Sequence, residues 1–287
     1  LFLGRDGAIL EGWTTLAALA GATRRARLGS IHLCNAFRAP ALMAKMSATL
    51  DQVSGGRLIF FYDAGWRQVE FEAYGFPFPD AATRVAQCRE GLEIIRRLWV
   101  SDEPVTYVGT YYQVHGAINR PGPVQRPHPP IWIGETREGL ADLAAEMADG
   151  WNSTPASVTQ YRTKLAEVEA ACRRRGRDIA ELELSLETQI LIGHTPADVR
   201  RLVDRIDELR AEAGGRSGEY STPDPHQVLS ERCDSWLVGT PDDVIDQLRA
   251  YVSLGVSHFM LWFLDAPHTD GLRLFAERVA PVFRRNA

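Results

Sequence analysis

The stretch Pro40–Tyr62, PALMAKMSATLDQVSGGRLIFFY, contains the pattern that decides the fold. Proline is tolerated at the first position of a helix, where its missing N–H costs nothing. Apolar side chains then recur at helical spacing: Leu42, Met46, Leu50 and Val53. The pair Gly55-Gly56 ends the helix, because glycine adopts the left-handed conformation freely. Leu58–Tyr62 is apolar throughout, as expected of a strand that is covered on both faces.

The same alternation of helix and strand continues along the chain on both sides of this stretch. The apolar periods predict further helices over Gly12–Arg25, Ala81–Val100, Arg137–Ala148, Val158–Arg175 and Gly271–Phe283. They predict further strands over Ala26–Leu33, Ile131–Ile133, Leu182–Ile192 and His258–Leu264, and another that begins at Gly150-Trp151. Strict alternation implies parallel strands joined by right-handed crossovers. Since neither GxGxxG nor a P-loop occurs, we favour a (β/α)8 TIM-type barrel over a doubly wound nucleotide domain.

Two irregular segments interrupt this alternation. Residues 101–130 are predicted to form an insertion with a short hairpin around Gly109, followed by the proline-rich run Pro121–Pro130. Residues 214–226 are polar and rich in turn formers, and they are predicted to form a mobile surface loop. We expect residues 1–287 to form a single barrel domain with these insertions.

Composition argues against several classes of protein. The 287 residues include 32 Lys and Arg against 37 Asp and Glu, so no basic excess is present to neutralise a nucleic-acid backbone. No apolar run reaches the roughly 20 residues that span a bilayer, and no signal peptide is recognisable. The four cysteines are widely scattered, which predicts reduced thiols and a cytoplasmic protein. The histidines and cysteines form no metal-binding pattern, so no metal is expected.

Several blocks of the sequence resemble the luciferase-like flavin monooxygenase family. They cover nearly the whole chain in order and spacing. The blocks are Leu28–Ser30, Phe37–Lys45, Thr49–Leu58, Ala64–Trp66 with Glu70, Ala73, Tyr74 and Gly75, Pro123–Gly134, Ala148–Asn152 and Val238–Pro241. The branch that uses the reduced deazaflavin coenzyme F-420 is the most similar, although the flavin mononucleotide (FMN) branch shares most blocks.

The resemblance implies a barrel in which the cofactor lies across the carboxyl ends of the strands, where barrel enzymes carry their chemistry. It also implies that the family's N-terminal strand, helix and second strand, with an Asp-His pair, precede the region that matches Leu1. Without them we expect six barrel strands in this sequence.

The resemblance implies that Ile31 and His32 lie against the flavin ring, with a non-prolyl cis bond near Ile31-His32. His32 would then donate to a ring heteroatom or act as an acid. The alternative is a histidine that simply packs within its strand. Asn35, just beyond the strand end, is a second polar candidate for catalysis. Cys34 is expected to be buried and unreactive.

The segment Phe61–Trp66 matches a glycine-rich stretch that helps to cradle the cofactor phosphate in the family. This implies cofactor contacts from Tyr62, Ala64, Gly65 and Trp66. Relatives commonly have glycine at the positions of Phe61 and Asp63. Asp63 would repel a phosphate, so it either faces the substrate as a catalytic carboxylate or serves as a helix cap or turn carboxylate. Aromatic side chains would provide a dry wall: Phe37, Phe61, Tyr62 and Trp66.

Gly134, Glu135 and Thr136 follow the strand Ile131–Ile133 and are predicted to open a helix. The N–H groups at a helix start favour an anion, and the resemblance places phosphate contacts here. An ordinary turn between strand and helix is the alternative.

Together these observations predict a flavin- or deazaflavin-dependent oxidoreductase that acts on a small organic substrate by hydride transfer or by peroxyflavin oxygenation. Two alternatives stay open: a non-catalytic flavin-binding protein on the same fold, and a flavin-free barrel hydrolase or lyase that uses Asp63 and His32. The predicted helices Gly12–Arg25 and Ala39–Val53 are rich in Ala, Leu and Met, and relatives often dimerise through this region, so we expect a homodimer. Neither nucleic acid nor a membrane is expected as a partner.

Overall fold

The deciding stretch adopts the predicted helix, stop and strand. In the computed structural model, which describes residues 10–214 and 234–284, α2 runs over Pro40–Ser54 and Gly55 ends it in the left-handed conformation, with φ 68°. The following strand, β2, spans Phe60–Asp63, and all four of its residues are buried. The predicted loop over 214–226 lies almost wholly outside the described residues.

The described chain divides into two compact units. The first, called here the amino-terminal unit, comprises Leu10–Asn152 and Ala166–Leu182. The second, the carboxy-terminal unit, comprises Ser153–Leu165 and the described part of Glu183–Ala287.

Four parallel strands form the sheet of the amino-terminal unit. They are β1 (Leu33–Cys34), β2, β5 (Ile131–Gly134) and β6 (Gly150–Ser153). β1 pairs with β2, β2 with β5 and β5 with β6, each in parallel. Their carboxyl ends therefore meet at one edge of the sheet.

The predicted strand Ala26–Leu33 was wrong in extent. Leu28 forms an isolated parallel bridge with Leu58, and regular pairing begins only at Leu33. Between them the chain leaves the sheet, and the Ile31–His32 peptide bond is cis, as the family resemblance implied. Gly29 lies where a side-chain carbon would come within 2.8 Å of the Phe61 ring.

Helices alternate with these strands along the chain. Their bounds are α1 (Gly12–Ala22), α3 (Gln68–Ala73), α4 (Ala81–Val100), α5 (Leu140–Met147) and α6 (Val158–Arg174), with short 3-10 turns at Asn35–Phe37, Arg137–Gly139 and Ile179–Glu181. α5 packs against β5, and α4 packs against α2 and α5. The predicted start of α5 at Arg137 was wrong, because Glu138 and Gly139 have positive φ and delay the helix to Leu140. α1 likewise ends at Ala22, short of the predicted Arg25.

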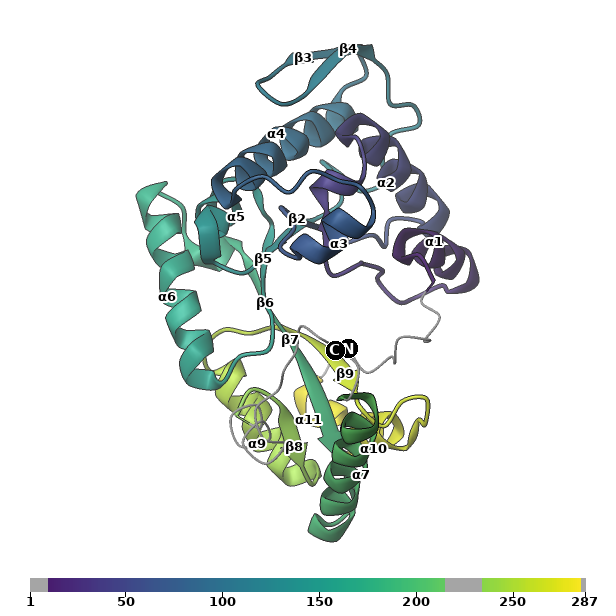
Figure 1. The fold of residues 1–287 in the computed structure, drawn as a ribbon, viewed down its shortest axis with the longest axis vertical. Helices are drawn as coiled ribbons and strands as arrows, with labels where there is room; N and C mark the ends of the chain where they lie inside the picture. The colour runs from purple at the N-terminus through teal and green to yellow at the C-terminus, as the bar shows by residue number, and fades with distance from the viewer. Residues whose placement is uncertain (1–9, 215–233, 285–287) are drawn as a thin grey trace. The chain divides into compact units, whose positions relative to one another are not determined.

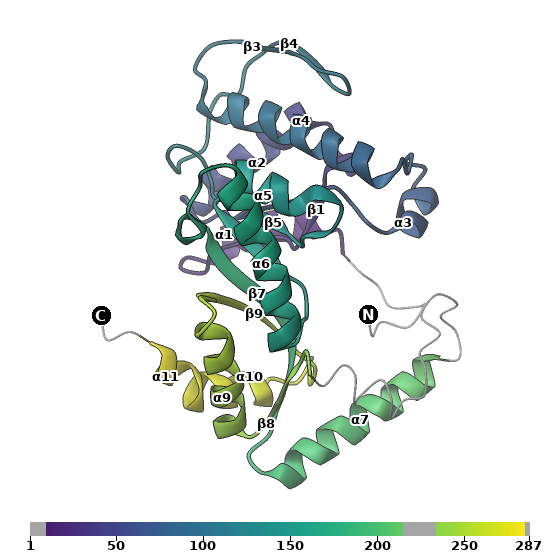
Figure 2. The ribbon, with the colours of Figure 1, turned by 90° about the vertical axis from the view of Figure 1, so that its left-hand side faces the viewer.

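The predicted hairpin is present and is antiparallel. β3 (Val105–Val108) pairs with β4 (Gln113–Ala117), and Figures 1 and 2 show the pair beside α4. Glu90 on α4 accepts the backbone N–H groups of Thr110, Tyr111 and Tyr112 at 2.8–3.2 Å. This carboxylate attaches the hairpin turn to the helix.

The carboxy-terminal unit repeats the parallel arrangement. β7 (Glu183–Ile192) pairs in parallel with β8 (Leu237–Gly239) and with β9 (His258–Phe263). Figure 2 shows helices grouped beside these strands. They are α7 (Pro196–Gly214), α9 (Pro241–Val252), α10 (Asp270–Arg278) and α11 (Ala280–Phe283), the last two replacing the single helix predicted over Gly271–Phe283. The buried side chains of this unit include a small hydrophobic cluster: Leu191, Ile206, Trp236 and Leu264.

A buried carboxylate anchors the proline-rich segment in front of β5. Asp51 on α2 is fully buried and accepts the N–H groups of Val124 and Gln125 at 2.8 and 2.9 Å. The Gln125 side chain donates to Asp51 and to the Leu58 carbonyl, both at 2.8 Å. Two of the sequence blocks that carry the family resemblance are thus joined through this contact.

We expect Asp51→Ala to lower the free energy of unfolding by about 3 kcal/mol, because three buried donors lose a charged acceptor. Asp246→Ala is the control: its side chain is 76% exposed in an ion pair with Arg249, so its cost should stay within about 0.5 kcal/mol. Urea unfolding followed by tryptophan fluorescence measures both. Equal losses in the two variants would contradict the anchoring role.

Candidate active site

Strand register stacks the inward-facing residues of the amino-terminal unit in two layers. Phe61 pairs with Trp132, and Trp132 with Gly150, so these three residues share a level. Their side chains share a face as well: the rings of Phe61 and Trp132 lie 5.0 Å apart, and a side-chain carbon at Gly150 would come within 2.6 Å of Trp132. This aromatic layer packs on the inner face of the sheet, one level below its carboxyl edge.

The next level up carries the polar residues. Two positions further along their strands, and therefore on the same face, lie Asp63, Gly134 and Asn152, of which Gly134 and Asn152 are paired. Asp63 is the last residue of β2 and Gly134 the last residue of β5. A carboxylate, a position without a side chain and an amide therefore stand side by side at the carboxyl edge.

His32 occupies the space that Gly134 leaves. A side-chain carbon at Gly134 would come within 2.6 Å of the His32 ring carbon Cε1. The His32 Nδ1 lies 4.0 Å from Asp63 Oδ2, and its Nε2 lies 3.5 Å from the amide nitrogen of Asn152. Since an amide N–H donates, the second contact favours the neutral tautomer with the proton on Nδ1, facing Asp63.

Burial keeps this imidazole neutral. It lowers the pKa of His32 below the ordinary value near 6.5, because removal from water penalises the charged form. The carboxylates of Asp63 and Glu135 act in the opposite direction, and the cation of Arg137 lowers the pKa further. The result is a neutral histidine flanked by two carboxylates, a group that can accept or donate a proton near neutral pH.

The two carboxylate oxygens of Asp63 make different contacts. Oδ1 accepts the N–H of Gly65 at 2.6 Å, which is the turn arrangement named above as the alternative to catalysis. Oδ2 is the oxygen that faces His32. Gly65 has φ 83°, and a side-chain carbon at this position would come within 2.7 Å of the Cys34 sulfur. Only glycine fits this turn.

The predicted aromatic wall is only partly as expected. Phe61 does face inward and packs edge-on against His32, with centroids 5.9 Å apart. Tyr62 points to the opposite, helix-covered side, where it stacks on Phe60 at 5.1 Å. Phe37 packs on Phe71 and Phe76 at 4.9 Å.

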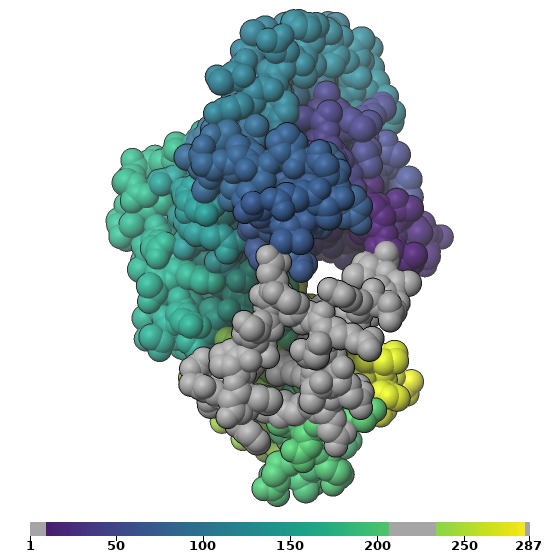
Figure 3. Space-filling view, in the orientation of Figure 1, coloured from purple at the N-terminus to yellow at the C-terminus, as the bar shows by residue number. Residues whose placement is uncertain are grey.

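Trp66, by contrast, is 56% exposed. It lies in the segment leading into α3, and α3 forms part of the surface seen in Figure 3. Ala64 is buried and Ile31 is 38% exposed.

Asn35 belongs to a buried network behind the sheet. Its carbonyl oxygen accepts the Tyr62 hydroxyl, and its amide donates to the Tyr112 hydroxyl, both at 2.8 Å. Gly91 of α4 provides the room, because a side-chain carbon there would overlap the Asn35 oxygen. Cys34 lies next in sequence, and burial raises the pKa of its thiol to about 12, so it stays protonated. These contacts make Asn35 a link between sheet, helix and hairpin.

The segment after β5 does not form the expected helix start. The N–H of Glu135 donates to the Asn152 carbonyl, so it is not free to contact an anion. Thr136 is half-buried and makes no capping hydrogen bond. Arg137, a residue that the sequence analysis did not select, stacks over Trp66 at 5.9 Å. Its signal was available in the sequence: a cation three residues beyond the end of a barrel strand.

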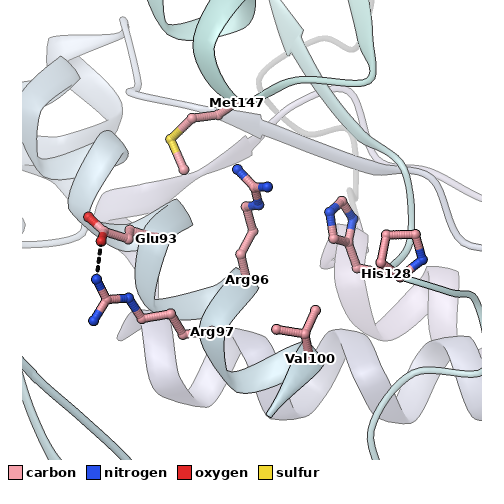
Figure 4. A pocket seen from close by; sticks show the side chains of 7 residues that line it. Glu93, Arg96, Arg97, Val100, His128 and Met147 are labelled. Atoms are coloured by element: carbon pink, nitrogen blue, oxygen red, sulfur yellow. Dashed lines mark hydrogen bonds and ion pairs between the residues drawn. The ribbon is translucent and has the colours of Figure 1, made fainter.

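A cavity of about 300 Å³ lies at the other end of the strands (Figure 4). Its lining combines α4 with residues just before β5 and at the end of α5: Glu93, Arg96, Arg97, Val100, Pro127, His128 and Met147. Arg97 is paired with Glu93. It lies before the start of β5, whereas barrel enzymes carry their chemistry at the carboxyl ends of the strands, so we leave this cavity out of the candidate site.

Within residues 10–214 and 234–284, no helix is long and apolar enough to cross a membrane. No three His, Cys, Asp or Glu side chains in these ranges are grouped so that they could hold a metal ion.

The model of the luciferase-like monooxygenase family matches residues 3–258. The chain belongs to this family. The match includes β1, β2, β5 and β6 and all the candidate site residues, so the family assignment covers the site as well as the fold.

Solved structures agree with the fold expected of the family. An F-420-dependent secondary alcohol dehydrogenase, solved with an F-420–acetone adduct, matches with a TM-score of 0.79 at 22% identity, over 99% of this chain and 87% of that one. The monooxygenase RslO1 from Streptomyces bottropensis matches with a TM-score of 0.80 at 25% identity, over 96% and 83%. The F-420-dependent tetrahydromethanopterin reductase from Methanopyrus kandleri matches with 0.76 at 20% identity, over 96% and 88%. These matches confirm the predicted α/β barrel class.

We expect Gly134→Ala to displace the His32 ring and to lower the free energy of unfolding by about 1–3 kcal/mol through overpacking. The matched control is Gly21→Ala near the end of α1, where the added methyl group meets nothing within 4 Å. That change should be neutral or stabilise by up to about 1 kcal/mol. Urea unfolding and the proton NMR signal of the His32 ring measure the effect. An unshifted ring signal in Gly134→Ala would refute the steric argument.

The lowered pKa of His32 predicts a loss of stability in mild acid. Below about pH 6.5 the unfolded chain protonates His32 while the folded chain does not, so stability falls with falling pH until the lowered folded-state pKa is passed. His32→Gln should remove this contribution, which is at most about 1.4 kcal/mol per pH unit. The test compares urea unfolding at two pH values inside and above this window. The exposed His268, changed to Gln, is the control, and an equal acid sensitivity of His32→Gln and the parent would count against burial as the cause.

Proposed function

We propose that this oxidoreductase of the luciferase-like family transfers a hydride between reduced F-420, or its oxidised form, and a small organic substrate. The observation that carries the proposal is the neutral His32 held beside Asp63 at the carboxyl edge of the sheet. Hydride transfer at a carbon that bears oxygen requires a proton to move at that oxygen. A neutral imidazole with a carboxylate beside it suits this step.

The residues fit the two ends of such a cofactor unequally. Near the ring, Phe61 and Trp132 provide an apolar floor and His32 provides a polar edge. Near the phosphate, Asp63 and Glu135 would repel an anion, so the loop amides expected from the sequence are poor candidates. The cation of Arg137 and the hydroxyl of Thr136 fit this end, and we propose that they contact the phosphate.

When bound, the deazaflavin supplies hydride chemistry, and the protein binds, orients and protonates. The Nδ1 proton of His32 faces Asp63, so Nε2 is the atom that would take the proton from a substrate hydroxyl, with the substrate replacing the 3.5 Å contact between Nε2 and the Asn152 amide. The Asp63 charge then stabilises the imidazolium formed. The buried aromatic layer below excludes water from this end of the site.

A second candidate is oxygenation of the substrate with reduced FMN. It is favoured by the match to the monooxygenase RslO1, whose fold this chain shares at 25% identity. The buried floor of Phe61 and Trp132 would protect an oxygen-reactive flavin from solvent equally well. A homodimer and a small-molecule substrate remain predictions from the sequence.

Titration of the purified protein with each reduced cofactor under anaerobic conditions, followed by absorbance, tests the proposal. We expect saturable binding of F-420 and its oxidation or reduction when a panel of small secondary alcohols and ketones is added. Preference for FMN, followed by oxygen consumption when air is admitted to the reduced complex with substrate, would support the second candidate. Binding without turnover would indicate a flavin-binding protein, and failure to bind either cofactor would overturn the proposal in favour of a flavin-free hydrolase or lyase.

We expect Asp63→Asn to lower kcat at least tenfold while cofactor affinity stays within about twofold, a loss of at least about 1.4 kcal/mol confined to the reaction. The asparagine oxygen can still accept the Gly65 N–H, but no charge then faces His32. The exposed Glu70→Gln on α3 removes one charge from the same region and is the control. Tighter cofactor binding by Asp63→Asn would mean that Asp63 crowds the phosphate, and unchanged kinetics would mean that it only supports the turn.

A further inference from the structure

A buried arginine on α4 contacts the segments that carry the candidate site residues. Arg84 lies in the first turn of α4, and only 6% of its surface is exposed. Its guanidinium donates from Nε to the Gly65 carbonyl at 3.0 Å and from a terminal nitrogen to the Pro79 carbonyl at 2.6 Å. The other terminal nitrogen lies 3.3 Å from Glu138 Oε2, and the group stacks over Phe78 at 4.1 Å. One side chain therefore joins three loops.

Two of these loops carry the candidate site. Gly65 is the residue whose N–H binds Asp63 Oδ1, while its carbonyl binds Arg84. Its backbone is thus held from both sides in the left-handed conformation. Glu138 belongs to the segment that follows Gly134, the position beneath the His32 ring.

We infer that Arg84 is a positioning residue, which fixes Gly65 so that Asp63 presents its second oxygen to His32. It acts through Asp63 and touches no reacting atom. The inference rests on the proposed function only in assigning a catalytic use to the His32–Asp63 pair. A lysine at this position would keep the charge but not the planar fork that reaches three partners at once.

The titration of His32 in the ligand-free protein reports this role without any cofactor. The groups that face the imidazole are Asp63 from β2, Glu135 and Arg137 from the segment after β5, and the neutral amide of Asn152 from β6. Among them, Asp63 is the one that Arg84 controls through Gly65. If Asp63 turns away, the imidazole loses a nearby anion and its pKa falls further.

The experiment follows the ring-proton NMR titration of His32 in Arg84→Lys, Asp63→Asn and the double variant. His32→Gln identifies the signal among those of the seven histidines. We expect Arg84→Lys to lower the titration midpoint by about 0.5 pH unit or more, and to cause no additional shift in the Asp63→Asn background. Arg96→Lys, the same substitution on the same helix but at the other end of the strands, is the control and should leave the midpoint unchanged.

An unchanged His32 midpoint in Arg84→Lys, or the same shift with and without Asp63, would overturn the inference. Arg84→Gln replaces the lysine variant if that variant does not fold, and failure of both to fold would show a general structural role instead. Where cofactor turnover is measurable, kcat should fall at least tenfold with the KM for cofactor nearly unchanged. The NMR result stands even if neither cofactor binds, so failure of the proposed function and failure of this inference are separate outcomes.

Discussion

The missing side chain at Gly134 is the constraint on which the candidate site depends. Strand register brings Gly134 level with Asn152 and next to Asp63, and the His32 ring fills the volume that any other residue would occupy. Four sequence-distant residues thereby become neighbours through backbone pairing alone. Asp51 attaches the segment before β5 to α2, and the Gln125 side chain joins the same segment to the Leu58 carbonyl just before β2.

The charges around His32 oppose its burial but do not outweigh it. Two carboxylates favour the imidazolium, whereas removal from water and the cation of Arg137 favour the neutral ring, and the net shift of the pKa is downward. Arg84 is also a buried charged group, and it donates to two carbonyl groups and pairs with one carboxylate. Such a buried cation costs several kcal/mol if its partners are removed, so the loops that it joins are held firmly.

Local signals in the sequence were sufficient for the regular elements. Pro40 and Gly55 marked both ends of α2, and the apolar period of α4 gave its observed bounds, Ala81–Val100. The strand predicted over Ala26–Leu33 was too long, because regular pairing with β2 begins only at Leu33, after an isolated bridge at Leu28. The family resemblance located the Ile31–His32 cis bond and selected His32 and Asp63, which the structure brings within 4.0 Å. Tyr62 was grouped with Asp63 although adjacent strand residues face opposite sides. Arg84 could not be selected, since its relevance depends on loops that meet only in three dimensions.

The departures from the family's glycine-rich stretch are matched by small residues on neighbouring strands. Phe61 requires Gly29, Trp132 requires Gly150, and His32 requires Gly134, because in each pair a side-chain carbon on the glycine would meet the ring at under 3 Å. Each large ring thus lies beside a glycine whose missing side chain leaves room for it, which keeps the interior close-packed. The Asp63 carboxylate is also held by its neighbours. Its Oδ1 accepts the N–H of Gly65, and the carbonyl of Gly65 accepts a hydrogen bond from the buried Arg84. The inner face of β2 therefore carries a packed ring at Phe61 and a carboxylate at Asp63 that is held by the Gly65 N–H.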